Sequence, residues 1–88
     1  MEQYIDYGFT SNGKAYRVSQ HLWEPKHWIA RFYPVDQTDF TVDIYCVSHF
    51  GAAAIPEINW SAMGAQSVEK AVAYAQTIMA AAEWIKSL

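Results

Sequence analysis

The stretch that decides the fold comes last, Ser67–Leu88, and reads SVEKAVAYAQTIMAAAEWIKSL. At about 100° per residue, one group of its apolar side chains falls within an arc of roughly 140°, with the i, i+3, i+4, i+7 spacing of an amphipathic helix. This group consists of Val68, Ala71, Val72, Ala75, Ile78, Met79, Ala82 and Ile85. Ser67 can serve as N-cap, because its hydroxyl can accept a hydrogen bond from a first-turn N–H. The pattern predicts a C-terminal helix that turns this stripe toward the core.

The opposite side of the predicted helix is also small and apolar, where a solvated face would carry Lys, Glu and Gln. It holds Ala73, Thr77, Ala80 and Trp84. Two interpretations stay open. Trp84 can fold down over the edge of a sheet, or the four residues can form a partner surface. In the second case a pair of such helices from two copies would give a two-fold homodimer.

Short strands and turns precede this helix. Residues 4–10 alternate in polarity, and Asn12-Gly13 follows them as a two-residue hairpin signal, since both positions tolerate positive φ. Further strands are predicted at residues 15–23, 27–33 and 39–47, with a short edge strand at 57–60. The predicted fold is α+β: a four- to five-stranded antiparallel sheet with one long C-terminal helix packed on one face. Residues 1–88 are expected to form a single domain.

Alternation within the strands predicts which side chains face the helix. The expected inward set is Ile5, Tyr7, Phe9, Tyr16, Val18, Leu22, Trp28, Ala30, Phe32, Phe40, Val42, Ile44 and Cys46. This set is consistent from strand to strand, which favours a single antiparallel meander.

The other face of the sheet is predicted to be open and rich in aromatic and arginine side chains. It would display Arg17, Trp23, Ile29, Arg31, Tyr33 and Tyr45, with Tyr4 beside them. Such a mixture is typical of protein interfaces. It can also stack unpaired bases, as sheet-based binders of single-stranded nucleic acid do. A third interpretation is that cross-strand aromatic pairs only stabilise the sheet.

Composition narrows the choice of partner. The formal net charge of the 88 residues is −3, which argues against direct nucleic-acid binding, because a phosphate-tracking surface needs a basic excess. The start of the chain, Met1-Glu2-Gln3, lacks the features of a signal peptide, and no apolar run approaches the length of a membrane span. The single cysteine, Cys46, suits a reducing compartment. We therefore expect a soluble, cytoplasmic protein without a membrane partner.

Residues that could carry chemistry do not form a known motif. His21, His27, His49 and Cys46 are of the types that bind zinc, but Cys46 and His49 lie three apart on a strand and point to opposite faces. Asp6, Asp43 and His21 could share the open face, yet the sequence specifies no nucleophile beside them. We therefore expect no metal, no cofactor and no enzymatic activity.

The C-terminal region resembles a pattern found in short sheet-plus-helix proteins of bacteria and their phages. The residues that carry this similarity are Asn59-Trp60-Ser61-Ala62, Gly64 and Ser67-Val68-Glu69-Lys70-Ala71. In size, mild acidity, aromatic content and lack of catalytic motifs, the chain is also similar to small phage-encoded inhibitors of the anti-CRISPR type. That similarity implies a non-enzymatic inhibitor that binds and blocks a larger host defence complex. These inhibitors share no common motif, so no residue role is transferred.

Overall fold

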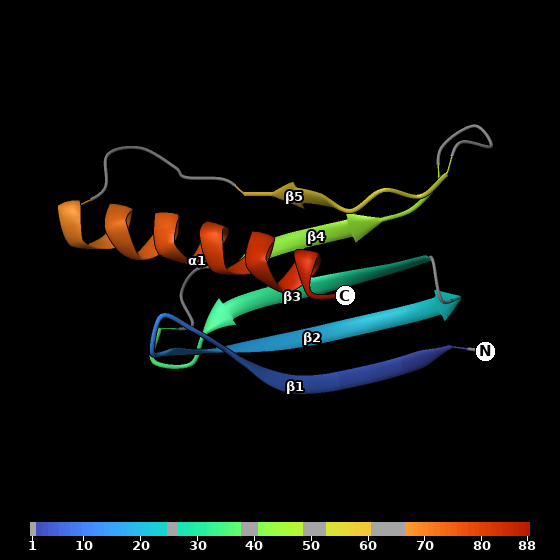
Figure 1. Ribbon diagram of the computed structural model, residues 1–88, viewed down its shortest axis with the longest axis horizontal. Coiled ribbons are helices and arrows are strands. Elements are labelled where there is room, and N and C mark those ends of the chain that lie inside the picture. Colours follow the sequence, from blue (N-terminus) through green and yellow to red (C-terminus); the bar gives the residue numbers. More distant parts are fainter. Residues whose placement is uncertain (1, 25–26, 38–40, 49–52, 61–66) are drawn as a thin grey trace.

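Five strands followed by one helix make up the described part of the chain. The computed structural model describes residues 2–24, 27–37, 41–48, 53–60 and 67–88. The elements are β1 (Gln3–Ser11), β2 (Lys14–Glu24), β3 (His27–Pro34), β4 (Val42–Cys46), β5 (Glu57–Asn59) and α1 (Val68–Lys86). The strands form one antiparallel sheet in chain order, and α1 packs on one of its faces (Figure 1). The predicted α+β fold, including the fifth strand, is confirmed.

The β1–β2 hairpin has the turn that its sequence predicts. Asn12 has φ 52° and Gly13 has φ 75°, and Ser11 pairs with Lys14 across the turn. Two successive positive φ values characterise the type I′ turn, whose twist matches that of the flanking strands. The turn sets the β1–β2 register, which then continues without a shift along β1. Because side chains alternate with a period of two, this register decides which residues share a face.

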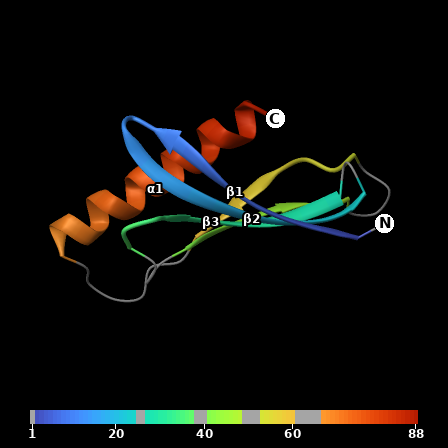
Figure 2. The same cartoon turned by 90° about the horizontal axis from the view of Figure 1, so that it is seen from below.

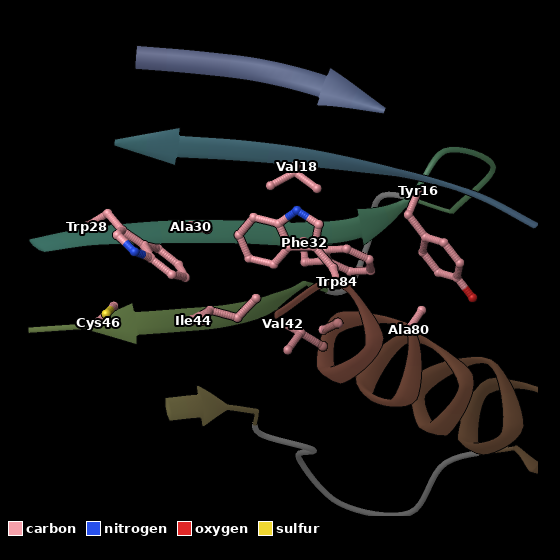
Figure 3. Close-up of a cluster of buried hydrophobic side chains, with 11 residues drawn as sticks. Tyr16, Val18, Trp28, Ala30, Phe32, Val42, Ile44, Cys46, Ala80 and Trp84 are labelled. Carbon is pink, nitrogen blue, oxygen red and sulfur yellow. The ribbon is translucent and has the colours of Figure 1, made fainter. Parts of the chain in front are cut away.

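The core lies between the inner face of the sheet and α1 (Figure 3). Its buried side chains are Tyr16, Val18, Trp28, Ala30, Phe32, Val42, Ile44, Cys46, Ala80, Ala81 and Trp84. Tyr7, Phe9 and Leu22 are half-buried and pack against this cluster, as predicted. Ile5 differs, because it lies on the edge strand and stays 36% exposed. Phe40, also predicted to face inward, lies outside the described residues.

The predicted orientation of the helix is wrong for most of its apolar stripe, although Ile78 and Ile85 of that stripe do pack against the core. α1 buries Thr77, Ala80, Ala81 and Trp84, whereas Val68, Val72 and Met79 are 80%, 50% and 71% exposed. Thr77, Ala80 and Trp84 are therefore buried inside the monomer, where a second copy cannot contact them, and Ala73 is half-buried. The proposed dimer surface at these four residues is accordingly wrong as well.

This side of α1 can be buried because the polar groups of Trp84 and Thr77 make hydrogen bonds. The indole Nε1–H of Trp84 donates to Tyr7 Oη at 3.0 Å, and Tyr7 in turn donates to Gln20 Oε1 at 3.3 Å. The Thr77 hydroxyl donates to the Ala73 carbonyl within the helix, at 2.8 Å. Buried polar groups with partners avoid most of the desolvation cost. The large Trp84 ring can then fill the core, which adds more buried apolar area than Val72 or Met79 would.

The N-terminal turns of α1 extend past the ends of the strands (Figures 1 and 2). Every residue from Ser67 to Val72 is exposed. The Ser67 hydroxyl accepts from the Lys70 N–H at 3.2 Å, so the predicted N-cap is confirmed. At the other end, Ser11 Oγ donates to Glu83 Oε2 at 2.6 Å and ties the helix to the β1–β2 turn. The sheet thus holds the C-terminal half of α1 more firmly than its beginning.

Candidate functional site

The sheet face opposite α1 is organised as two neighbouring rows that cross all five strands. Antiparallel register places the members of each row directly opposite one another. One row is Tyr4, His21, Ile29, Tyr45 and Glu57, and the other is Asp6, Ser19, Arg31, Asp43 and Asn59. The first row is mainly aromatic and apolar, and the second is polar and charged.

The members of these two rows on β1 to β4 line a groove of about 540 Å³ on the open face. Its walls include Tyr4, His21, Ile29 and Tyr45 on the apolar side and Asp6, Arg31 and Asp43 on the polar side. The volume lies in the range of ligand-binding pockets, about 300–1,000 Å³. The groove crosses strands β1 to β4 on the face of the sheet opposite α1.

Aromatic rings stack at one end of the groove. The Tyr4 and His21 rings lie 4.2 Å apart with an interplanar angle of 19°, and Trp23 lies 4.1 Å from His21 at 40°. Tyr4 is 76% exposed although it takes part in this stack. His21 Nε2 is shielded from solvent and makes no hydrogen bond within the described residues, and the nearest carboxylate oxygen, on Glu2, lies 3.7 Å away. The stack presents a preformed apolar platform.

Both arginines of the open face are paired with aspartates. Arg31 Nε lies 3.2 Å from Asp43 Oδ1 directly across β3 and β4, and Arg17 lies 3.3 Å from Asp6. Ser19 Oγ also donates to Asp6, at 3.2 Å. At such exposed positions these pairs contribute at most about 1 kcal/mol each to stability. They do orient the guanidinium groups and reduce the positive potential that a phosphate backbone would need.

The six residues predicted as a partner surface all lie outside the core on this face. Ile29, Arg31 and Tyr45 line the groove. Arg17 and Tyr33 pair with each other one row further along β2 and β3. Trp23 does not line the groove, but its ring contacts His21, which does. Sequence reasoning missed the aspartate partners of the arginines, because the diagonal and direct pairings depend on register.

The structure also brings together a second polar cluster, Glu24, His27 and Ser48, which the sequence analysis did not predict. His27 Nδ1 lies 3.1 Å from Glu24 Oε2, and His27 Nε2 lies 3.0 Å from Ser48 Oγ. The order of these contacts matches that of a hydroxyl nucleophile, its base and an orienting carboxylate. A hollow of about 620 Å³, lined in part by Trp28 and Ile85, adjoins it.

The Glu24–His27–Ser48 cluster lies at the surface and is accessible to solvent. The Glu24 side chain is 67% exposed, so its carboxylate is solvated and cannot act on the imidazole as a buried one would. The contacts join the end of β2 and the start of β3 to the segment after β4. Nearby, burial raises the pKa of the Cys46 thiol, which keeps it protonated and weakly nucleophilic. We therefore interpret the cluster as structural.

Other classes of site find little support in the described segments. No three potential metal ligands come together there, and His49 of the predicted candidates lies outside them. The one described helix is not long and apolar enough to cross a membrane. No family model, curated protein or solved structure matches the chain. The fold and the open face define a sheet-plus-helix domain with an aromatic-lined groove.

Proposed function

We propose that the protein is a non-enzymatic module that binds another protein through its open sheet face. The observation that carries this proposal is the groove, in which a stacked aromatic platform adjoins Arg31, whose side chain is oriented by Asp43. Tyr, Trp and Arg dominate binding hot spots because they combine large area with directional polar groups. Side chains that are already ordered lose less conformational entropy on binding.

Single-stranded nucleic acid is the alternative ligand class. The Tyr4–His21–Trp23 stack favours it, since bases stack on exposed aromatic rings. The charges oppose it, because Asp6 and Asp43 neutralise the two arginines of this face. Protein binding accounts for the apolar and the charged row together, whereas base stacking accounts for the aromatic row alone.

The similarity to phage-encoded inhibitors leads to a narrower proposal about the partner. The open face would cover a functional surface of a larger protein or nucleoprotein complex and block it. A domain of 10.0 kDa can do this by occupying a site, with no chemistry of its own.

Capture experiments with matched variants test the binding surface. Arg31→Ala and Tyr45→Ala each remove a groove side chain, while Val35→Ala alters an exposed residue outside the groove. We expect the wild type and Val35→Ala to retain the same partner from source-cell extract and both groove variants to lose it, with all four proteins folded by circular dichroism. Retention by both groove variants would refute the proposed surface. Salt-sensitive binding of a fluorescent oligonucleotide, lost in Arg31→Ala, would instead establish the alternative.

The non-enzymatic part of the proposal has a separate test at Ser48. A fluorophosphonate probe reacts with activated serine hydroxyls, and we expect no adduct by intact-mass spectrometry, because the Glu24–His27–Ser48 network is solvated. An adduct that disappears in Ser48→Ala but persists in Ser19→Ala would show an activated nucleophile and overturn this part. The result does not depend on whether the groove binds a partner.

A further inference from the structure

The outward side of α1 carries a seam with the spacing of a coiled coil, apolar at every position except its last, Lys86. Successive seam residues are separated by four, three, four, three and four positions, which is the heptad pattern of helix–helix packing. They are Val68, Val72, Ala75, Met79, Ala82 and Lys86. Val68, Val72 and Met79 are 80%, 50% and 71% exposed, so this part of the seam lacks cover within the monomer.

The flanks of the seam differ from each other. Glu69, Gln76 and Glu83 follow one side at seven-residue spacing, and Ala71, Ile78 and Ile85 follow the other. One flank is therefore acidic or polar; on the other, Ile78 and Ile85 pack against the protein's own core and only Ala71 is exposed. The seam and its exposed polar flank together define what a partner must present: a helix with the same 3.5-residue repeat and no acidic side chain opposite Glu69.

We propose that this seam binds the same seam of a second copy, as an antiparallel helix pair with two-fold symmetry. Closed two-fold dimers use one patch twice, so the patch must complement itself. An antiparallel register centred between Ala73 and Tyr74 meets this condition. It sets Val68 beside Met79 of the partner subunit and Val72 beside Ala75 of the partner subunit.

Charge selects this register among those that keep the seams in contact. Centred between Ala73 and Tyr74, it sets Glu69 beside Gln76 of the partner subunit, which can donate a hydrogen bond from its amide. A register shifted by one heptad would set Glu69 beside Glu83 of the partner subunit, and like charges repel there. A parallel pair would bring Lys86 of both copies together, and the two positive charges would repel each other.

The position of α1 makes room for the second copy. The N-terminal turns, which hold Val68 and Val72, extend past the strands, so two helices can meet there with the sheets held apart (Figure 2). The small side chain of Ala75 allows a close interhelical approach. Contact over residues 68–79 spans about 17 Å of helix. It covers less than the roughly 800 Å² per partner of a standard stable interface. The dimer is therefore expected to be weak, with a dissociation constant of about 0.1–1 mM.

Sedimentation equilibrium from about 10 µM to 2 mM chain tests the proposal in that affinity range. Wild type should shift from monomer to dimer over this interval. Val72→Glu should remain monomeric, whereas Val35→Glu should dimerise like wild type. Val35 is 51% exposed and Val72 is 50% exposed, so the pair controls for adding a charge at a half-exposed valine. A wild-type monomer at the highest concentration, or a dimer that tolerates Val72→Glu, would overturn the proposal.

Changes at Gln76 test the register. Gln76→Lys should tighten the dimer about two- to fivefold at low salt, because the lysine would face Glu69 of the partner subunit, and Gln76→Glu should weaken it by a similar factor. Both effects should shrink at high salt. Equal effects of the two substitutions would rule out this register. Groove variants such as Tyr45→Ala should leave dimerisation unchanged, because the groove lies on the opposite face of the sheet, so this proposal can fail independently of the proposed function.

Discussion

Replacing Trp84 with alanine tests the orientation of α1. The side chain is 2% exposed, and its ring lies 5.4 Å from Trp28, 6.2 Å from Phe32 and 6.4 Å from Tyr7. Truncating a buried tryptophan costs about 3–5 kcal/mol, from lost transfer energy and the remaining cavity. The change also leaves Tyr7 Oη without its indole donor. A chain of 88 residues has a free energy of unfolding of about 4–13 kcal/mol, so the variant should be severely destabilised.

Urea unfolding followed by far-ultraviolet circular dichroism, at micromolar chain concentration, measures this loss. With an m-value of about 1 kcal/mol/M, the midpoint should fall by about 3–5 M or the variant should be unfolded from the start. Met79→Ala is the matched control on the same helix. Met79 is 71% exposed, so its truncation should change stability by no more than about 0.5 kcal/mol. A loss at Met79 equal to that at Trp84 would refute the observed helix orientation.

Three further predictions concern the hairpin, the helix anchor and alkaline pH. Gly13→Ala should cost about 1 kcal/mol in unfolding free energy by urea titration, because φ is +75° there; no loss would contradict the turn assignment. Ser11→Ala should lower stability by about 1–3 kcal/mol, because its hydroxyl donates to the Glu83 carboxylate, and an unchanged urea midpoint would show that this contact contributes nothing. Desolvation raises the pKa of Tyr7 and of Cys46 above their ordinary values, and for Tyr7 it outweighs the lowering effect of the Trp84 hydrogen bond. Folding therefore favours the protonated forms, so this contribution to stability should be complete below the ordinary pKa values of Cys46 and Tyr7, 9.0 and 10.0, and should be lost as pH rises past them. A flat stability profile at alkaline pH would refute this.

Local signals in the sequence sufficed for the elements and their order. Asn12-Gly13 specifies a turn with two positive φ values, and that turn sets the β1–β2 register. Alternation in each strand then assigns side chains to the two faces, because neighbouring residues in a strand point in opposite directions. Alternation within the strands was therefore sufficient to predict that Arg31 and Tyr45 lie on the open face.

The arrangement of the groove required the register between strands. Arg31 meets Asp43, and Tyr4 stacks on His21, because antiparallel pairing sets residues far apart in the chain directly opposite each other. Alternation predicts that these residues share a face but not which of them touch. For the same reason, the contact between His27 and Ser48 could not be read from the sequence.

The orientation of α1 shows most clearly what the sequence by itself determined and what only tertiary structure decided. Ser67 at the N-cap and the alanine-rich run determine locally that a helix forms. The helix is apolar on nearly all sides, so its own periodicity does not select the buried face. That choice depends on the rings of Tyr7, Trp28 and Phe32 and on the hydroxyl of Tyr7, which together accommodate Trp84. These partners come from strands distant in the sequence, and only the folded sheet brings them to one place.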